Sequence, residues 1–216
     1  MPAFEVSTAE QGTEQWFIDR LGYVTASNME AVMAKGQGVT RNKYLVKTAC
    51  EVLTGKPTTN TFKSKYMQAG NDNEPRARAL YTAVTGNDVR RVGFCFIPSE
   101  KLGASLDGEI VQDDDGIMEI KNVIATEQVE LITTGKIKAG YIKQIQTQMY
   151  VKDKKWCDFT SVCFGDDENG YLPDEHKIKI IRVYRDEDMI KEIRKEVAFF
   201  IYDLNKLLNK LKGESK

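Results

Sequence analysis

Two runs of alternating apolar and polar residues flank a short acidic stretch near the middle of the chain. They lie within residues 103–123, GASLDGEIVQDDDGIMEIKNV. Such alternation is typical of strands with one buried face. Between Gln112 and Gly116, three aspartates and the glycine favour a tight reversal. The pattern therefore predicts a β-hairpin in which Val111 faces Ile117.

This pairing brings three charged side chains onto one face of the hairpin. Asp107 lies opposite Lys121, and Glu119 is diagonal to Asp107. Mg²⁺ prefers oxygen ligands, and an adjacent ammonium group can orient or help deprotonate an attacking water or offset phosphate charge. One interpretation of this face is a nuclease metal site. The other is an exposed hairpin whose charges form a salt bridge.

Helical periodicity dominates the chain before the hairpin. Two short helices separated by a break are predicted within residues 12–34, and a longer one over residues 41–53. Another helix is predicted over residues 64–85, where Pro75 favours a bend or irregular turn beside Glu74.

Strand patterns are more frequent in the second half of the chain. The predicted elements are a strand at 89–98, a loop and then a helix within 123–151, strands at 157–165 and 177–185, and a closing amphipathic helix within 186–216. Residues 1–11 are expected to be loosely ordered. The length suits one domain with its own core, so residues 1–216 are predicted to form a single domain.

Charge and composition exclude several classes of protein. The formal net charge of −1 gives no overall attraction to nucleic acid, so any DNA contact has to come from a local basic patch. With neither a signal-peptide pattern nor a long apolar run, the chain is expected to be cytoplasmic, with no membrane partner. The four cysteines lack CxxC spacing and His176 is the only histidine, which argues against iron–sulfur, structural zinc and histidine-dependent catalysis.

Several polar residues outside the hairpin have two interpretations. Ser27 is either a plain helix cap or part of a phosphate site at a helix N-terminus. Arg20 is either solvated or directed at an anion. Glu74 taken alone reads as a surface acid. Gln144 and Gln148, one helical turn apart, either face water or contact a nucleic-acid backbone.

Four motifs occur in an order that has a known counterpart. They are WFIDRLGYVTAS (16–27), MQAGNDNEPRAR (67–78), SLDG followed by EIK (105–121), and YIKQIQTQMYV (141–151). On these motifs the chain resembles the phage lambda exonuclease family of viral recombination nucleases, within the PD-(D/E)xK superfamily. The resemblance implies an α/β fold with a central mixed β-sheet flanked by helices and a restriction-endonuclease-like core.

The resemblance also implies roles for individual residues. Metal ions would be held by Asp107, Glu119 and Ile120, while Lys121 would assist the attacking water. Glu74 would lie near a second metal ion. The remaining roles fall to Gln144 near the metal or scissile phosphate, Tyr141 beside it, Arg20 and Ser27 on the 5′ phosphate, and Met67 as a wedge that opens the duplex end.

The implied activity is 5′-to-3′ hydrolysis of one strand of linear double-stranded DNA to mononucleotides. It would use Mg²⁺, with two ions expected and Mn²⁺ able to substitute. The 3′ tails would serve phage recombination by strand annealing. A ring-shaped homotrimer would enclose the duplex, with a single-strand annealing protein as partner. The alternatives are a structure-specific or helicase-dependent endonuclease of the same superfamily and a non-catalytic DNA-binding or assembly module.

The chain departs from the family pattern at three places. Leu106 stands where a proline usually precedes the aspartate, which puts the rigidity of that turn in question. Glu109 is an additional acid on the predicted face of Asp107. A second phosphate-binding arginine of the family has no clear counterpart, and Lys35 or Arg41 is the candidate to replace it.

Overall fold

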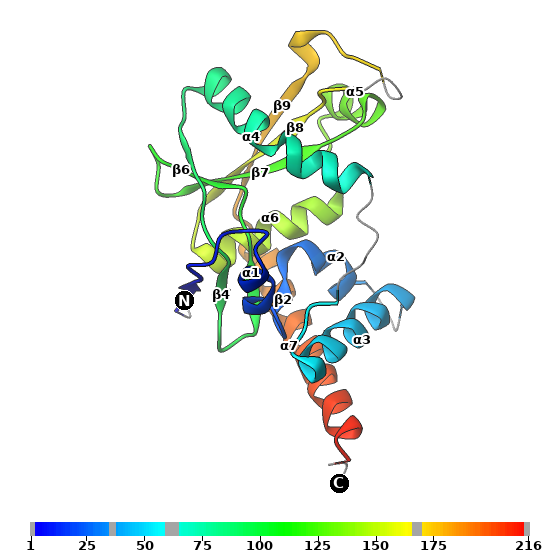
Figure 1. Cartoon of the computed structure of the whole chain (residues 1–216). Coiled ribbons are helices and arrows are strands. Elements are labelled where there is room, and N and C mark those ends of the chain that lie inside the picture. Colours follow the sequence, from blue (N-terminus) through cyan, green and yellow to red (C-terminus); the bar gives the residue numbers. More distant parts are fainter. Residues whose placement is uncertain (1–2, 35–37, 59–64, 166–169, 214–216) are drawn as a thin grey trace.

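The computed structural model (Figure 1) describes residues 3–34, 38–58, 65–165 and 170–213, with side chains for all of these except 65–71. The described strands form two mixed sheets. The first has the order β1-β4-β5-β2, comprising β1 (Glu5–Val6), β4 (Cys95–Ile97), β5 (Leu102–Ala104) and β2 (Val24–Thr25). The second has the order β3-β6-β7-β8-β9, comprising β3 (Val89–Arg90), β6 (Gly108–Ile110), β7 (Gly116–Asn122), β8 (Trp156–Val162) and β9 (Ile178–Tyr184).

Helices account for most of the remaining described chain. The α-helices are α1 (Glu14–Asp19), α2 (Met29–Val32), α3 (Val39–Thr54), α4 (Lys65–Thr85), α5 (Ala125–Thr134), α6 (Ala139–Lys152) and α7 (Glu187–Leu211). Two 3₁₀ turns, η1 (Ala26–Asn28) and η2 (Asp174–His176), complete the set. The predicted closing helix is confirmed as α7, which Asp186 caps by accepting from the N–H groups of Asp188 and Met189.

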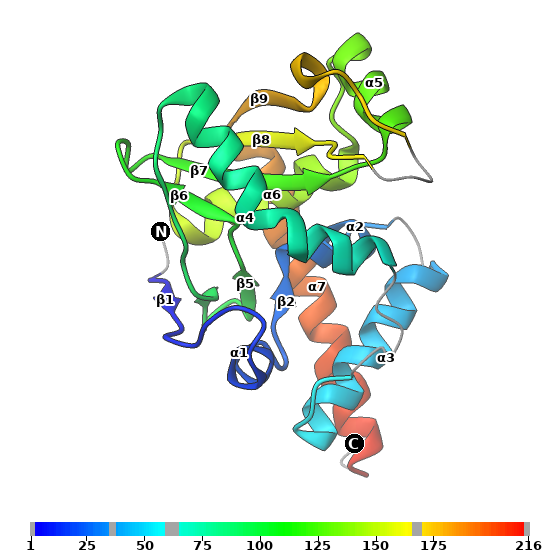
Figure 2. The ribbon, with the colours of Figure 1, turned by 45° about the horizontal axis from the view of Figure 1, so that its top comes forward.

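Helix α6 is at the centre of the molecule because it contacts both sheets and α7. The alternation along β7 sends Ile117 into one core cluster with Ile145 and Met149 of α6. It sends Met118 and Ile120 into a second cluster on the other face, with α4. The larger sheet thus lies between α4 and α6, as Figure 2 shows.

Two helices form an arm that leads to the C-terminus. Figure 1 shows α3 and α7 side by side at the lower end of the molecule. The rings of Tyr44 and Phe200 stack at 5.1 Å between centroids, and Arg41 joins the helices through a 2.8 Å ion pair with Asp203. These contacts bury one stripe of α7, in accordance with its amphipathic pattern.

The predicted α/β fold with a mixed sheet flanked by helices is confirmed for the larger sheet, and the main difference is that the described strands form a second mixed sheet. The predicted strand at 89–98 is split between β3 and β4, which belong to different sheets. The first strand of the predicted hairpin is likewise split into β5 and β6, and Ser105–Asp107 carries the chain from one sheet to the other. Asp107 therefore lies at the junction of the two sheets.

Smaller corrections concern elements whose sequence signals are weak. Residues 1–11 contain β1, which pairs with β4, so this stretch is not wholly irregular. The stretch predicted as a loop before α6 contains α5, which Gly135 ends in a left-handed conformation. Helix α4 continues through Pro75 and changes direction about halfway along its length in Figures 1 and 2, as expected where proline removes a helical hydrogen bond.

Candidate active site

The hairpin brings Asp107 and Glu119 together more directly than predicted. Gly108 pairs with Met118 and Glu109 with Ile117, so continuing this register places Asp107 opposite Glu119. The predicted pairing of Val111 with Ile117 was wrong by two residues. Because side chains alternate with a period of two, this shift leaves the charged residues on the predicted face. The backbone N–H of Ile120 donates to Oδ2 of Asp107 at 2.6 Å, which fixes the aspartate against β7.

Three side chains hold the carboxylate of Glu119, which is only 1% exposed. Lys121 Nζ lies 2.5 Å from Oε1, and Gln144 Nε2 donates to the same oxygen at 2.6 Å. Gln148 Nε2 donates to Oε2 at 2.6 Å. Gln144 also accepts from Lys121 at 3.3 Å through Oε1, so lysine, glutamate and glutamine form a closed network.

The cluster contains the two carboxyl groups of Asp107 and Glu119 and one ammonium group, that of Lys121. Burial and then the charge of Glu119 raise the pKa of Asp107 well above its usual range, against the opposing effects of Lys121 and the Ile120 N–H. Burial alone would lower the pKa of Lys121, but the charges of Glu119 and Asp107 reverse this, so its pKa lies above its usual range. Lys121 is therefore an ammonium ion at neutral pH in this arrangement.

Arg78 links Glu74 to this cluster. Arg78, one helical turn later in α4, donates to the carboxylate of Glu74 and to the backbone carbonyl of Asp107, the second at 3.3 Å. Among the described residues, no three His, Cys, Asp or Glu side chains converge closely enough to hold a metal ion. Glu74 is thus near Asp107, with its carboxylate engaged by Arg78.

The donor set nevertheless fits a hard divalent cation. Asp107 and Glu119 offer carboxylate oxygens, and their mutual repulsion is what an added cation would relieve. Ile120 has only its backbone carbonyl to offer as a ligand. The residues that would hold the metal are therefore Asp107 and Glu119, with Ile120 and Glu74 as the remaining candidates.

A second candidate site surrounds Arg20, which follows α1. Its guanidinium lies over the Trp16 ring, 3.9 Å from the centroid, and makes no hydrogen bond or ion pair with any residue in the described ranges. Burial lowers the pKa of Arg20 to about 10, against the opposing effects of Tyr44 and Glu51. Arg20 is still charged at neutral pH, so this half-buried cation is suited to an anionic ligand.

Ser27 is exposed on η1, and hydrogen bonds connect it through Thr25 to Tyr44. The hydroxyls of Ser27 and Thr25 are 3.4 Å apart, and the Thr25 N–H donates to the Tyr44 hydroxyl at 3.2 Å. Neither η1 nor α2 has a side-chain cap hydrogen bond, so the plain-cap interpretation of Ser27 is wrong. Because η1 contacts α6 and β5, Ser27 is carried by a turn that rests on the helix of Gln144.

The other predicted residues fall into different environments. Tyr141 of α6 stacks on Phe159 at 5.7 Å, and the ammonium of Lys121 lies 5.0 Å from its ring centroid. Met67 is within α4, but its side chain lies outside the described residues, as does Lys35. Arg41 is paired with Asp203 on the α3–α7 arm.

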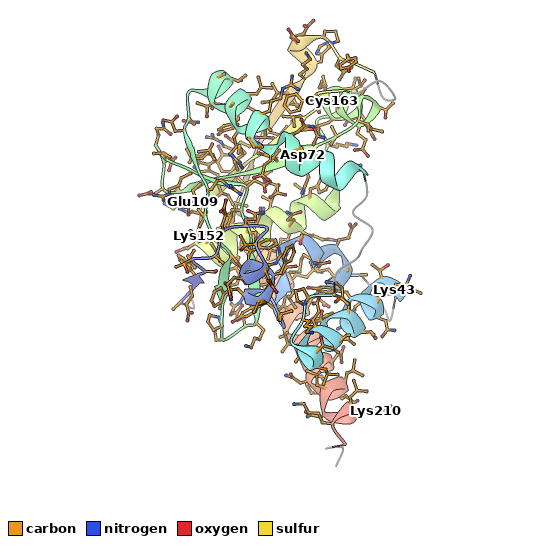
Figure 3. All side chains as sticks on the ribbon, in the orientation of Figure 1. Lys43, Asp72, Glu109, Lys152, Cys163 and Lys210 are labelled. Atoms are coloured by element: carbon orange, nitrogen blue, oxygen red, sulfur yellow. The ribbon has the colours of Figure 1, made fainter. Side chains whose placement is uncertain are left out.

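Glu109 does not join the carboxylate cluster. It is 4% exposed and contacts Arg90 at 2.9 Å, Lys152 at 3.2 Å and Lys154 at 3.5 Å. Burial would raise the pKa of Glu109, but Arg90 and Lys152 outweigh this and lower it. Figure 3 shows Glu109 and Lys152 close together. Glu109 is therefore not a further acid of the Asp107 cluster, because these cations engage its carboxylate.

Gln148 is a further contributor to the site, whose environment the sequence analysis predicted wrongly. Both interpretations of an exposed glutamine were wrong for it, because it is fully buried and contacts Glu119. The available signal was its spacing, since Gln144 and Gln148 occupy successive turns of one helix face.

Comparisons with known proteins identify the family to which the chain belongs. Residues 15–155 match the profile of the YqaJ-like viral recombinase domain. The structure of LHK-Exo in complex with dAMP is similar, with 40% sequence identity and a TM-score of 0.83. The alignment covers 94% of this chain and 97% of that chain. The alkaline exonuclease LHK-Exo from Laribacter hongkongensis gives 39% identity, the same coverages and a TM-score of 0.82.

A more distant structure shows the fold alone. The phage-related exonuclease from Haemophilus somnus 129PT is 17% identical, with 88% of this chain and 96% of that chain covered and a TM-score of 0.73. No curated protein sequence matches the chain. Within the described ranges, no helix combines the length and the apolar character needed to cross a membrane. The profile match and the identity to LHK-Exo, together with the motif resemblance to the lambda exonuclease family, show that the chain belongs to the YqaJ-like viral recombinase family.

Proposed function

We propose that the chain is a metal-dependent 5′-to-3′ exodeoxyribonuclease that degrades one strand of linear double-stranded DNA to mononucleotides. The convergence of Asp107, Glu119 and Lys121 on one end of the hairpin carries this proposal. The likeness to LHK-Exo, an alkaline exonuclease also studied with dAMP, supports a nuclease activity.

The acidic pair would hold the cation on which hydrolysis depends. Asp107 and Glu119 supply the oxygens, Ile120 a carbonyl, and Glu74 a further carboxylate for a second ion. Bound Mg²⁺, or Mn²⁺ in its place, would polarise the scissile phosphate and lower the pKa of water. We propose two ions on the resemblance to the lambda exonuclease family; the second would require the carboxylate of Glu74 to leave Arg78.

Lys121 would act as a fixed cation beside the scissile phosphate. Its ammonium is held by Glu119 and Gln144, so it is preorganised to donate to a phosphate oxygen or a water. Its raised pKa keeps it protonated at neutral pH, which favours charge stabilisation over proton abstraction in this arrangement. Gln144 would fix the lysine, and Tyr141 would line the same side of the site.

Arg20 and Ser27 would bind the terminal 5′ phosphate. A guanidinium that has no anionic partner within the described ranges and an exposed hydroxyl on η1 are suitable donors for a phosphate dianion. Anchoring the end while cutting the next phosphodiester bond would release one nucleotide at a time. Met67 would separate the terminal base pair.

The resemblance to viral recombination nucleases supports our proposal for the biological setting. The 3′ single-stranded tails would be used for phage recombination by strand annealing in the host cytoplasm, with an annealing protein as partner. A homotrimeric ring would retain the duplex by enclosure, which suits a chain of net charge −1. A stable monomer in a solution mass measurement would contradict the ring.

Digestion of defined duplexes tests the activity. Linear DNA with 5′-phosphoryl ends should yield mononucleotides with Mg²⁺ and none with chelator, and 5′-hydroxyl ends should be cut more slowly. Asp107→Ala should be inactive. Equal cutting of closed circular DNA would indicate an endonuclease, and binding without cutting under all metal conditions would indicate a non-catalytic module.

A further inference from the structure

Gln148 connects the two segments that carry the acidic pair. Its Nε2 donates to Oε2 of Glu119 at 2.6 Å and to the backbone carbonyl of Ser105 at 3.2 Å. Glu119 belongs to β7, while Ser105 begins the segment that crosses between the sheets and ends at Asp107. One amide group therefore bonds to both sides of the candidate metal site.

The chemistry of the partners fixes the orientation of this amide. A backbone carbonyl can only accept a hydrogen bond, so the nitrogen of Gln148 has to face Ser105. With the side chain turned over, Oε1 would face the Ser105 carbonyl and the Glu119 carboxylate, and both contacts would become repulsive. Gln148 is thus committed as a double donor.

Because Gln148 is buried, Glu119 and Ser105 are its only hydrogen-bond partners among the described residues. Gln148 is 0% exposed, and its Oε1 and the Ser105 hydroxyl are both buried without a hydrogen-bond partner among the described residues. Leaving a buried polar atom unpaired is costly, so a position retained only for packing would favour an apolar side chain. The amide of Gln148 leaves its oxygen unpaired, while its nitrogen keeps the two hydrogen bonds to Glu119 and to the segment that ends at Asp107.

We propose that Gln148 is a positioning residue that holds Glu119 and the Asp107 segment at the separation required to bind a divalent cation. The inference rests on the proposed metal-dependent function. Gln148 acts through Glu119 and Ser105 without touching the ion. Gln144 holds the other oxygen of Glu119, so the two residues orient that carboxylate from one helix face.

The test compares Gln148→Met with a matched variant on the same helix. Methionine has about the length of glutamine and lacks its donors. Gln146 is 2% exposed and also makes two hydrogen bonds, to the Tyr184 carbonyl at 2.8 Å and from the Asp186 N–H at 2.9 Å, so Gln146→Met is the control. Mn²⁺ binding is measured by calorimetry without DNA, and thermal unfolding is measured in chelator.

Gln148→Met should weaken Mn²⁺ binding by about 10- to 100-fold, the usual range for a residue that orients metal ligands. It should raise the Mg²⁺ concentration for half-maximal cleavage to a similar extent and leave most of kcat at saturating metal. Gln146→Met should lose comparable thermal stability and keep wild-type metal affinity. Wild-type affinity in Gln148→Met, or an equal loss in both variants, would overturn the proposal.

Two provisions keep the result interpretable. If Gln148→Met does not fold, Gln148→Asn retains the amide on a shorter side chain that cannot span both partners, and it should show an intermediate loss of affinity; wild-type affinity there would overturn the proposal. Failure of the wild-type protein to cut DNA ends, combined with weaker Mn²⁺ binding by Gln148→Met, would refute the exonuclease function and leave the positioning role standing.

Discussion

The N–H of Ile120 donates to Oδ2 of Asp107 at 2.6 Å, so the residue between Glu119 and Lys121 holds the other acid in place. The donor is a backbone N–H, and the side-chain oxygen of Asp107 can accept from it without being charged. Replacing the side chain by its amide therefore separates the charge of Asp107 from its position.

Asp107→Asn should abolish metal-dependent cleavage and stabilise the metal-free protein. The amide oxygen can accept from Ile120, while the repulsion with Glu119 disappears. We expect a gain on the order of 1 kcal/mol, or roughly 2–4 °C in Tm for a chain of this size. Thermal unfolding in chelator measures it, and a lower Tm than wild type would contradict the repulsion described for the acidic pair.

Lys121→Met should slow single-turnover cleavage by at least about 100-fold at saturating Mg²⁺, because the fixed ammonium beside the scissile phosphate is lost. DNA-end binding should be retained. Lys138→Met provides the control, since Lys138 lies 6.0 Å from the same Tyr141 ring and pairs with Glu127 on the surface. Equal rates for the two variants would remove Lys121 from the proposed mechanism.

Arg20→Gln should eliminate the preference for 5′-phosphoryl over 5′-hydroxyl ends, because the cation suited to the terminal phosphate is removed. The fall in rate on phosphorylated ends should be about 10- to 100-fold, equivalent to the loss of roughly 1.4–2.8 kcal/mol of interaction. Arg91, which pairs with Glu10 at 3.5 Å on the surface, gives the control variant Arg91→Gln. A preserved end preference in Arg20→Gln would place the phosphate site elsewhere.

Tyr81→Phe should destabilise the fold by about 1–3 kcal/mol, because Tyr81 donates at 2.8 Å to the buried carboxylate of Asp158. Burial and this bond raise the pKa of Tyr81 from 10.0 to about 12. The stabilisation is therefore complete below about pH 10, the value in the unfolded chain, and is lost as the pH rises through about 12. Unfolding free energies of both proteins between pH 8 and 12 should converge, and a constant difference would contradict the assignment.

The sequence predicted the hairpin face correctly and its register incorrectly, for physical reasons that can be identified. Periodicity of two places Asp107, Glu119 and Lys121 on one face whichever even shift occurs. The shift arises because the turn comprises Val111–Asp115, and Gly116 already belongs to β7. The crossing at Ser105–Asp107 was not visible because the polar and apolar alternation continues through it.

Burial of polar residues was the other feature beyond the reach of the sequence. Gln128, Gln146 and Gln148 are all nearly or fully buried, and each is satisfied in part by backbone carbonyls far away in the sequence. A glutamine in a helix gives no local sign of such a partner. The missed α5 has the same origin, because its buried face includes the polar Gln128.

The position of Asp107 directly before β6 implies that a bound ion would act as a cross-link within the larger sheet. Asp107 lies opposite Glu119 of the neighbouring strand β7 when the register of the two strands is continued. An ion that takes oxygens from both would hold this end of the β6–β7 pair together, and separation of the two strands at Asp107 would dismantle the site. The pairing of the strands at this end and the occupancy of the site would therefore be thermodynamically linked, each reinforcing the other.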